Sequence, residues 1–203
     1  RHCGRGGTGA VMGAKRVKAI ILDDTGMKMR EPKDPEKFRD ANRRFVEGLR
    51  KHPLTGEGLP AYGTNVLTNV LNEAGAYPTN NFRTGQFEHA GKISGEVLAE
   101  LEVKRGGVAT KGCQRGCVIQ CSGIYNDATG KYLSKPAAYE TVWSFGGNCG
   151  ISDLDIIQTL DRMADDFGLD TIGTGAASGV PLEGGLPPCG AGAERSRIRP
   201  DAA

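Results

Sequence analysis

Apolar residues recur at helical spacing in several stretches of the chain. Asp34 and Pro35 suit the N-cap and first position of a helix whose apolar face is Phe38, Ala41, Phe45 and Leu49. A second helix is predicted over residues 66–74, ending at Gly75, and a shorter one begins at Ser94. The pattern therefore predicts a mainly α-helical fold.

The clearest helical pattern begins at Ser152, whose spacing to Asp155 resembles a capping box. Gly168 ends this helix, and its apolar face comprises Ile156, Ile157, Leu160, Met163, Ala164 and Phe167. From Gly173 onward the pattern gives way to Gly, Ala and Pro, so no further helix is predicted there. The tail at 189–203 has no apolar face and is predicted to be disordered.

Patterns typical of β structure are few. The run VKAIIL at Val17–Leu22 is rich in β-branched residues and is interpreted as a buried strand. A hairpin or turn is expected around Asp127–Gly130. The fold class that we predict is mainly α, with a short β segment at the N-terminus.

Charge and composition narrow the classes of partner. Lys and Arg total 26 against 24 acids, a net charge of +2 that gives no reason to expect nucleic acid or a membrane surface. No apolar run approaches the roughly 18–20 residues of a membrane span, and no signal-peptide pattern opens the chain. We therefore expect a cytoplasmic protein. Glycine is enriched, at 31 of 203 residues, which indicates many sharp turns or close backbone approaches.

Three of the six cysteines are clustered. Cys113, Cys117 and Cys121 form a C-x3-C-x3-C pattern in a polar, glycine-rich setting. Clustered thiolates suit an iron–sulfur cluster or zinc, and the alternative is three buried cysteines that act as small hydrophobes. The setting favours metal. A fourth ligand would come from a distant cysteine, such as Cys149, or from one that this chain lacks.

Gly4, Gly6 and Gly9 spell the G-x-G-x-x-G pattern of dinucleotide-binding proteins. No strand precedes them, and the stretch before the predicted strand is too short for a crossover helix, so we reject that function. Two interpretations stay open. In one, the exposed backbone N–H groups of the glycines bind an anion together with the neighbouring basic residues. In the other, the segment is a glycine turn and these basic residues are only solvated. The basic residues are Arg1, Arg5, Lys15 and Arg16.

The helix that ends at Gly168 carries acids where a helix disfavours them. Asp165 and Asp166 lie at the negative end of its dipole, and Asp161 lies four residues before Asp165. Such a cluster calls for a cationic or hydrogen-donating partner. The alternative is an exposed acidic helix end that is tolerated at small cost.

Glu140 lies in an aromatic setting that includes Tyr139 and Trp143. It is therefore a candidate acid or base, and the alternative is a half-exposed glutamate on a strand. His52 and His89 have no evident ligand partner, so ordinary surface or core roles are expected for them.

Four segments together resemble the tungsten-containing aldehyde ferredoxin oxidoreductase family. They are Gly4–Ile20, Gly75–Glu96, Tyr139–Asp155 and Asp165–Gly175, and they occur in the order found in that family. The resemblance extends from Arg1 to about Pro188. It implies an enzyme that oxidises aldehydes to carboxylic acids, or runs a related low-potential reduction, and passes electrons through a 4Fe–4S cluster to ferredoxin. Tungsten, or sometimes molybdenum, is held in this family by two pterins.

The resemblance also implies roles for particular residues. Cys113, Cys117 and Cys121 resemble three ligands of the 4Fe–4S cluster, and Glu140 resembles the active-site glutamate. The first of two D-x-x-G-L-(C/D) pterin motifs corresponds to Asp165, Gly168, Leu169 and Asp170. The region that binds the pterin phosphates and magnesium corresponds to Arg1, His2, Arg5, Gly6 and Gly7.

The resemblance divides the chain into parts. Residues 1–30 correspond to the end of an N-terminal pterin-binding β domain, and 31–188 correspond to a helical middle domain with the iron–sulfur and pterin motifs. The family spacing is C-x2-C-x3-C, so this chain has one extra residue. We expect a fragment whose partners are the missing N- and C-terminal domains, ferredoxin or another iron–sulfur carrier, and a small aldehyde or acyl substrate.

Two other functions stay open from the sequence alone. One is a stand-alone iron–sulfur or zinc module for electron transfer or structure, completed by Cys149, Cys189 or an exogenous ligand. The other is a non-catalytic remnant without metal.

Overall fold

A computed structural model describes residues 3–28 and 30–184. In chain order its helices and strands are α1 (Thr8–Ala14), α2 (Pro35–Lys51), α3 (Leu59–Tyr62), α4 (Leu67–Glu73), α5 (Gly95–Lys104), β1 (Val108–Lys111), β2 (Ser122–Asn126), β3 (Tyr132–Ser134), α6 (Tyr139–Phe145), α7 (Leu154–Phe167) and α8 (Thr171–Glu183). Short 3-10 turns occur at Arg5–Gly7, Gly63–Val66, Ala90–Ile93 and Gly147–Cys149, and a π turn at Leu54–Gly58. The mainly helical prediction is confirmed for the described residues.

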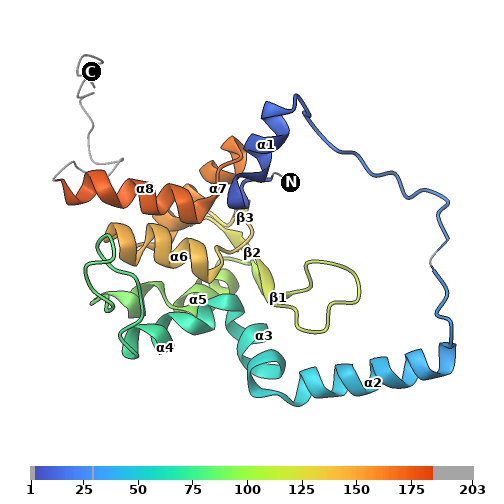
Figure 1. Ribbon diagram of the computed structural model, residues 1–203. Helices are drawn as coiled ribbons and strands as arrows, with labels where there is room; N and C mark the ends of the chain where they lie inside the picture. The colour runs from blue at the N-terminus through green and yellow to red at the C-terminus, as the bar shows by residue number, and fades with distance from the viewer. Residues whose placement is uncertain (1–2, 29, 185–203) are drawn as a thin grey trace.

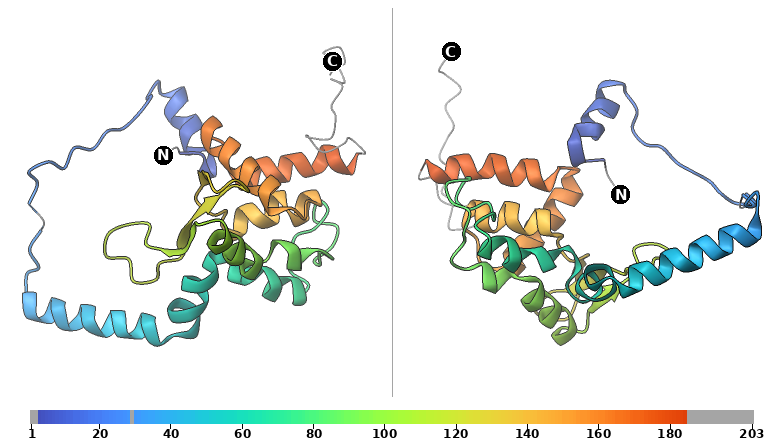
Figure 2. Two further views of the ribbon diagram at one scale, coloured as in Figure 1. Left: turned by 180° about the vertical axis from the view of Figure 1, so that it is seen from behind. Right: turned by 60° about the horizontal axis from the view of Figure 1, so that its bottom comes forward.

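Helices α4 to α8 and the small sheet form one packed body (Figure 1). Helix α2 and the irregular segment that precedes it extend away from this body, as the two further views in Figure 2 show. Helix α1 lies at the opposite end of that segment and returns to the side of α7. The chain thus brings its N-terminal part next to a helix that is more than a hundred residues distant in sequence.

The core surrounds α6, which packs against α7 and α8. Val142 and Ile157 are fully buried there, and Tyr77 packs edge-on against Tyr139 with 6.0 Å between ring centroids. Helix α7 buries only part of its predicted apolar face. Ile157 and Ala164 are buried and Leu160 packs against the core, whereas Ile156, Met163 and Phe167 are exposed. Gly175 of α8 lets the helices meet closely, because a Cβ there would lie 2.0 Å from the hydroxyl oxygen of Ser144.

The three strands form an antiparallel sheet in the order β1-β2-β3. Val108 pairs with Ile124, and Tyr125 pairs with Ser134. The expected turn at Asp127–Gly130 is confirmed as the connection between β2 and β3. The carboxylate of Asp127 accepts the backbone N–H groups of Thr129 and Lys131. Beyond β1, an isolated bridge between Lys111 and Cys121 closes the loop that carries the cysteines.

Several predicted helix ends are confirmed. The Asp34 carboxylate caps α2 by accepting the N–H of Lys37, and Ser94 caps α5. Gly168 ends α7 in the left-handed conformation, with φ of 70°. The cap of α7 is Asp153 and not the expected Ser152, because the Asp153 carboxylate accepts the N–H groups of the first turn.

Two predictions are wrong. Val17–Leu22 forms no strand, and Ile21 and Leu22 are 88% and 90% exposed. A strand needs a neighbour for its backbone groups, and no described segment pairs with this one; the strands lie at 108–134 instead. The stretch after Gly173 belongs to helix α8, because packing against α6 outweighs the low helix propensity of its glycines. The expected disordered tail at 189–203 lies outside the described residues.

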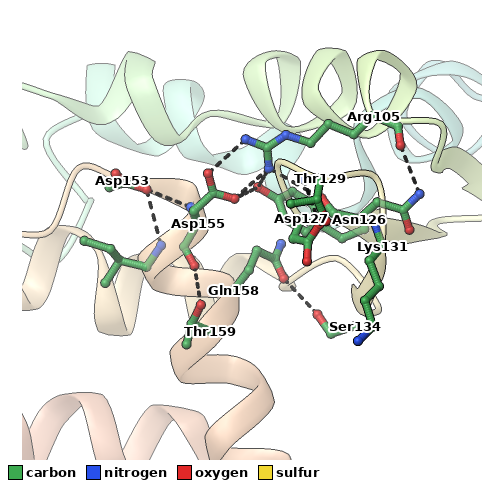
Figure 3. Close-up of polar contacts among 12 residues, drawn as sticks. Arg105, Asn126, Asp127, Thr129, Lys131, Ser134, Asp153, Asp155, Gln158 and Thr159 are labelled. Atoms are coloured by element: carbon green, nitrogen blue, oxygen red, sulfur yellow. Dashed lines mark hydrogen bonds and ion pairs between the residues drawn. The ribbon is translucent and has the colours of Figure 1, made fainter. Parts of the chain in front are cut away.

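A polar cluster ties α5, β2 and α7 together (Figure 3). The guanidinium of Arg105 donates two hydrogen bonds to Asp155, of 2.6 and 2.9 Å, and one to the Tyr125 hydroxyl. The Tyr125 hydroxyl donates to Asp155 at 2.8 Å. The hydrogen bonds from Arg105 hold the pKa of the Asp155 carboxyl below its usual value.

Among the described residues, no helix is both long and apolar enough to span a membrane.

Candidate functional site

The cysteine loop, residues 112–121, connects β1 to β2. Cys113 is exposed, Cys117 and Cys121 are half-buried, and all three thiols are free. Gly116 and Gln120 have φ of 83° and 54°, so the loop turns sharply twice. The Cys117 sulfur accepts the N–H of Gln120 at 3.4 Å.

Backbone hydrogen bonds in this loop stabilise a thiolate. The N–H of Gln120, followed by that of Ile119, lowers the pKa of the Cys117 thiol below its ordinary value. Thiolates are the form in which cysteine binds metal. The loop therefore prepares at least one of the predicted ligands for that role.

The donor chemistry of this loop suits a soft metal, because cysteine thiolates bind iron–sulfur clusters and zinc alike. Within residues 3–28 and 30–184, no group of three or more His, Cys, Asp or Glu side chains is arranged to hold a metal ion.

Cys149 has the properties of a structural thiol. It lies between α6 and α8, where its S–H is 3.3 Å from the carbonyl oxygens of Ser144 and Gly175. Burial raises the pKa of its thiol to about 11, which disfavours the thiolate. This environment does not favour Cys149 as the fourth ligand, and Cys189 lies outside the described residues.

The predicted pterin motif forms the corner between α7 and α8. Gly168 reverses the chain, and the N–H of Leu169 donates to the Ala164 carbonyl at 2.8 Å. Asp170 then caps α8, because its carboxylate accepts the N–H of Gly173 at 2.9 Å. Asp165 thus lies in the last turn of α7, and Gly168, Leu169 and Asp170 connect α7 to α8.

Lys135 supplies the cation that the acidic helix end requires. Its ammonium lies 2.9 Å from the Asp161 carboxylate and 3.2 Å from that of Asp165. The Asp161 side chain is 2% exposed, and burial raises the pKa of its carboxyl even though Lys135 opposes that shift. Taken alone, the sequence pattern favours an exposed acidic helix end, and this is wrong for the buried Asp161. A cationic or hydrogen-donating partner is the alternative that the pattern leaves open, and it does not identify Lys135.

The N-terminal glycine segment lies against this same corner. The guanidinium of Arg5 forms an ion pair with Asp170, across 165 positions of sequence. Burial opposes ionisation of Asp170, but the hydrogen bond from Gly173 and the charge of Arg5 outweigh it and lower the pKa of the carboxyl. Gly6 and Gly7, with φ of 68° and 71°, form the turn that leads from Arg5 into α1.

Two segments that the resemblance assigns to pterin binding therefore meet. A cavity of about 630 Å3 lies between them, with Gly168 on one side and Cys3, Gly9, Met12 and Arg16 among the residues on the other. Arg1 and His2, which the resemblance places at the pterin phosphates, lie outside the described residues.

Glu140 lies in the first turn of α6, so the alternative of a strand glutamate is wrong. It is half-buried, and the start of its helix is fixed by a hydrogen bond from the N–H of Tyr139 to the Thr64 hydroxyl. The next residue, Thr141, bonds the hydroxyl of Thr171 at 2.9 Å. Helix α6 is thereby anchored to the first turn of α8, beside the pterin-motif corner.

His52 and His89 have ordinary surroundings. The imidazole Nδ1 of His52 accepts the N–H of Leu54, and the ring of His89 packs edge-on against Phe87.

Comparison with known proteins places this arrangement in a family. The sequence profile described as "Aldehyde ferredoxin oxidoreductase, domains 2 & 3" matches residues 40–183. Tungsten-containing aldehyde ferredoxin oxidoreductases from Pyrococcus horikoshii and Thermococcus kodakarensis are 42% identical over 90% of this chain and 29% of their own length. The WOR-like subunit of an aliphatic sulfonate oxidoreductase from Pyrococcus furiosus is 29% identical over 89% of this chain and 28% of its own length. The chain thus spans less than a third of the relatives that it matches, and it belongs to the aldehyde ferredoxin oxidoreductase family.

Proposed function

We propose that this chain is the middle part of a longer tungsten or molybdenum bis-pterin oxidoreductase. Its reaction would be oxidation of a small aldehyde to a carboxylic acid, or a related reduction of an acyl substrate, with electrons leaving through a 4Fe–4S cluster to ferredoxin or another iron–sulfur carrier. The observation that carries this proposal is the contact between Arg5 and Asp170, which joins the two proposed pterin segments in a body that also holds the cysteine loop. The relatives' names support the choice of reaction.

Cys113, Cys117 and Cys121 would hold the cluster. Hydrogen bonds to the Cys117 sulfur favour its thiolate form, and the closed loop limits the space that the three thiols explore. The fourth ligand would come from a part of the protein outside residues 3–28 and 30–184. When bound, such a cluster accepts and releases single electrons.

The α7–α8 corner would hold one pterin. Carboxylates of Asp165 and Asp170 accept hydrogen bonds, which suits the N–H donors of a pterin ring. Lys135 keeps Asp165 in place. Arg5 with the Gly6–Gly7 turn would supply positive charge and backbone N–H groups to a pterin phosphate, whose oxygens would in turn bind magnesium. Arg1 and His2 would complete that phosphate site. When bound, the pterin-held metal supplies the two-electron chemistry.

Glu140 would exchange a proton with water or substrate. Conversion of an aldehyde and water to a carboxylic acid releases two protons and two electrons, so a general base near the reacting carbon is needed. Helix α6 holds this carboxyl next to the corner through the contact between Thr141 and Thr171. The side chain is only half-buried in the described residues, so it is available to a ligand.

The proposal is tested by metal analysis of the native protein after strictly anaerobic purification. We expect about four irons together with tungsten or molybdenum. Cys117→Ser should remove the cluster's visible absorption, whereas Cys149→Ser, a matched control, should retain it. Iron without either heavy metal would instead support an electron-transfer module, and zinc alone or no metal would refute the proposal.

A second pair of variants separates catalysis from cofactor retention. Glu140→Gln should retain iron and the heavy metal but lose at least a hundredfold in aldehyde oxidation, the contribution typical of a general base. Asp165→Asn should release pterin and heavy metal while the iron content stays. Full activity in Glu140→Gln would show that this residue is not the base.

A further inference from the structure

A pocket of about 190 Å3 lies under the cysteine loop, separate from the cavity beside Gly168. Its lining includes Asn65, Glu102, Cys121 and Lys135. It therefore touches a predicted cluster ligand on one side and the lysine that binds the pterin-motif acids on the other. Nothing in the proposed reaction uses this pocket.

Two buried acceptor atoms belong to residues that line the pocket and have no partner. Glu102 is 3% exposed and Asn65 is 2% exposed, yet the Glu102 Oε1 and Asn65 Oδ1 atoms make no hydrogen bond. The Asn65 amide nitrogen donates to the Ala137 carbonyl at 2.6 Å, so the orientation of this amide is fixed and its oxygen is the end that stays free. Buried polar atoms of this kind are rare in folded proteins and require an explanation.

The surrounding backbone makes room for the carboxyl group. A Cβ at Gly123 would lie 2.9 Å from the Glu102 Oε1 atom and 2.4 Å from the Val108 carbonyl oxygen. A Cβ at Gly95 would lie 2.9 Å from the Asn65 backbone. Gly123 therefore leaves room for the Glu102 carboxyl, and Gly95 lets α5 approach the backbone of the turn that carries Asn65.

The two unpartnered atoms define which ligand fits the pocket. The Asn65 Oδ1 atom can only accept, and the Glu102 carboxyl accepts when ionised and can also donate when protonated, so the ligand must donate at least one hydrogen bond or carry positive charge. Burial raises the pKa of the Glu102 carboxyl to about 8, so this group is mostly uncharged at neutral pH and offers little attraction to a cation. Water is a neutral donor that fits: the pocket is larger than one water molecule requires, and it presents at least two polar partners.

We propose that this pocket is a binding site for ordered water, held by Glu102 and Asn65, that supports the backbone at Cys121. Asn65 lies in the 3-10 turn Gly63–Val66, and Gly63 packs against the Cys121 carbonyl, which would lie 3.0 Å from a Cβ there. The water would join this turn to α5, and both elements would then hold the end of the cysteine loop in place. The support of a cluster ligand rests on the proposed function, whereas the binding of water does not.

Water binding is tested by a high-resolution crystal structure of the native protein at pH 7. We expect a water peak within hydrogen-bonding distance of both Glu102 Oε1 and Asn65 Oδ1. Glu102→Gln should keep the peak, because its amide retains an acceptor oxygen, and Glu102→Leu should lose it. Glu100→Leu, an exposed change on the same helix, is the matched control and should keep it.

Two results would overturn the water site. One is an empty pocket, or a direct hydrogen bond between Glu102 and Asn65, in the unaltered protein. The other is an anomalous peak in crystals soaked with rubidium or thallium(I), which would show a monovalent cation instead. The unaltered protein decides both, so the test does not depend on whether Glu102→Leu folds.

The support of Cys121 is tested in protein loaded with iron. Glu102→Leu should shift the midpoint potential of the cluster in a titration followed by electron paramagnetic resonance, with Glu102→Gln and Glu100→Leu close to the unaltered value. An unshifted potential in Glu102→Leu, despite loss of the water, would refute this role. Failure of the protein to bind iron would refute the proposed function and leave the crystallographic result on water intact.

Discussion

Lys135→Met would remove the only cation that contacts Asp161 among the described ion pairs. Methionine keeps much of the length and apolar character of the lysine stem but leaves the carboxylate without its partner at 2.9 Å. The Asp161 side chain is 2% exposed, so solvent cannot replace the lost charge. Its remaining contact is a long one, 3.5 Å from the Thr141 hydroxyl.

The loss of folding free energy in Lys135→Met follows from the burial of Asp161. Removal of one partner from a buried ion pair costs about 3–5 kcal/mol, but Lys135 is 52% exposed, so we discount the loss to about 2–3 kcal/mol. Burial already raises the pKa of Asp161, and loss of Lys135 raises it further. A carboxyl with a raised pKa in the folded state contributes stability below its unfolded pKa and loses it as pH rises. The variant should therefore be closest to normal at pH 4.5, just above the unfolded pKa, and least stable at pH 8.

Urea denaturation of the native protein at pH 4.5, 6 and 8 measures this cost. Lys92→Met, at an exposed lysine, is the control and should change the free energy of unfolding by less than about 0.5 kcal/mol. Asp161→Asn combined with Lys135→Met should recover most of the loss, because the buried charge is then absent. A cost below about 0.5 kcal/mol at pH 8, or a larger cost at pH 4.5, would refute the reasoning.

Three further predictions concern other parts of the fold. Asp155→Ala breaks the hydrogen bonds with Arg105 and should lower the free energy of unfolding, measured in urea, by about 2–3 kcal/mol. Because the pKa of Asp155 is lowered in the folded protein, the difference between the variant and the unaltered protein should shrink as pH falls toward 3, and a constant difference would contradict this reasoning. Gly168→Ala forces a left-handed φ of 70° on alanine and should lower the stability measured in thermal melts by about 1 kcal/mol. Gly13→Ala is the control, because the φ of Gly13 is not positive. Glu102 has a raised pKa, so stability should fall between about pH 4.5 and pH 8 by at most about 1.4 kcal/mol per pH unit, and Glu102→Gln should flatten this profile in denaturant titrations.

Local signals predicted the helices whose ends are fixed by nearby residues. Asp34 with Pro35, Ser94 and Gly168 each satisfy backbone groups within their own turn, so the sequence alone identifies these ends. Helix α8 has a local cap in Asp170, but its interior glycines disfavour a helix, and contact with Ser144 and its neighbours on α6 explains why the helix continues. The run at Val17–Leu22 has β propensity but no described partner strand, and propensity alone does not satisfy a backbone.

The same distinction applies to the candidate site. The spacing of Asp161 and Asp165 leaves a cationic or hydrogen-donating partner open beside an exposed helix end, and only the fold shows that Lys135 provides the charge. The pairing of Arg5 with Asp170 spans nearly the whole described chain, and no periodic pattern relates the two. The burial of Glu102 has a weak signal in the sequence, because this residue lies four positions after Leu98 and so shares the buried face of α5.

The bridge between Lys111 and Cys121 gives the cysteine loop fixed ends. For a loop closed in this way, the entropy of closure grows only with the logarithm of its length, so one added residue among the nine of 112–120 costs about 0.1 kcal/mol. The extra residue between Cys113 and Cys117 therefore has almost no effect on the free energy of folding. Ligand spacing in this protein can drift by insertion while β1 and β2 keep their register and the rest of the core is undisturbed.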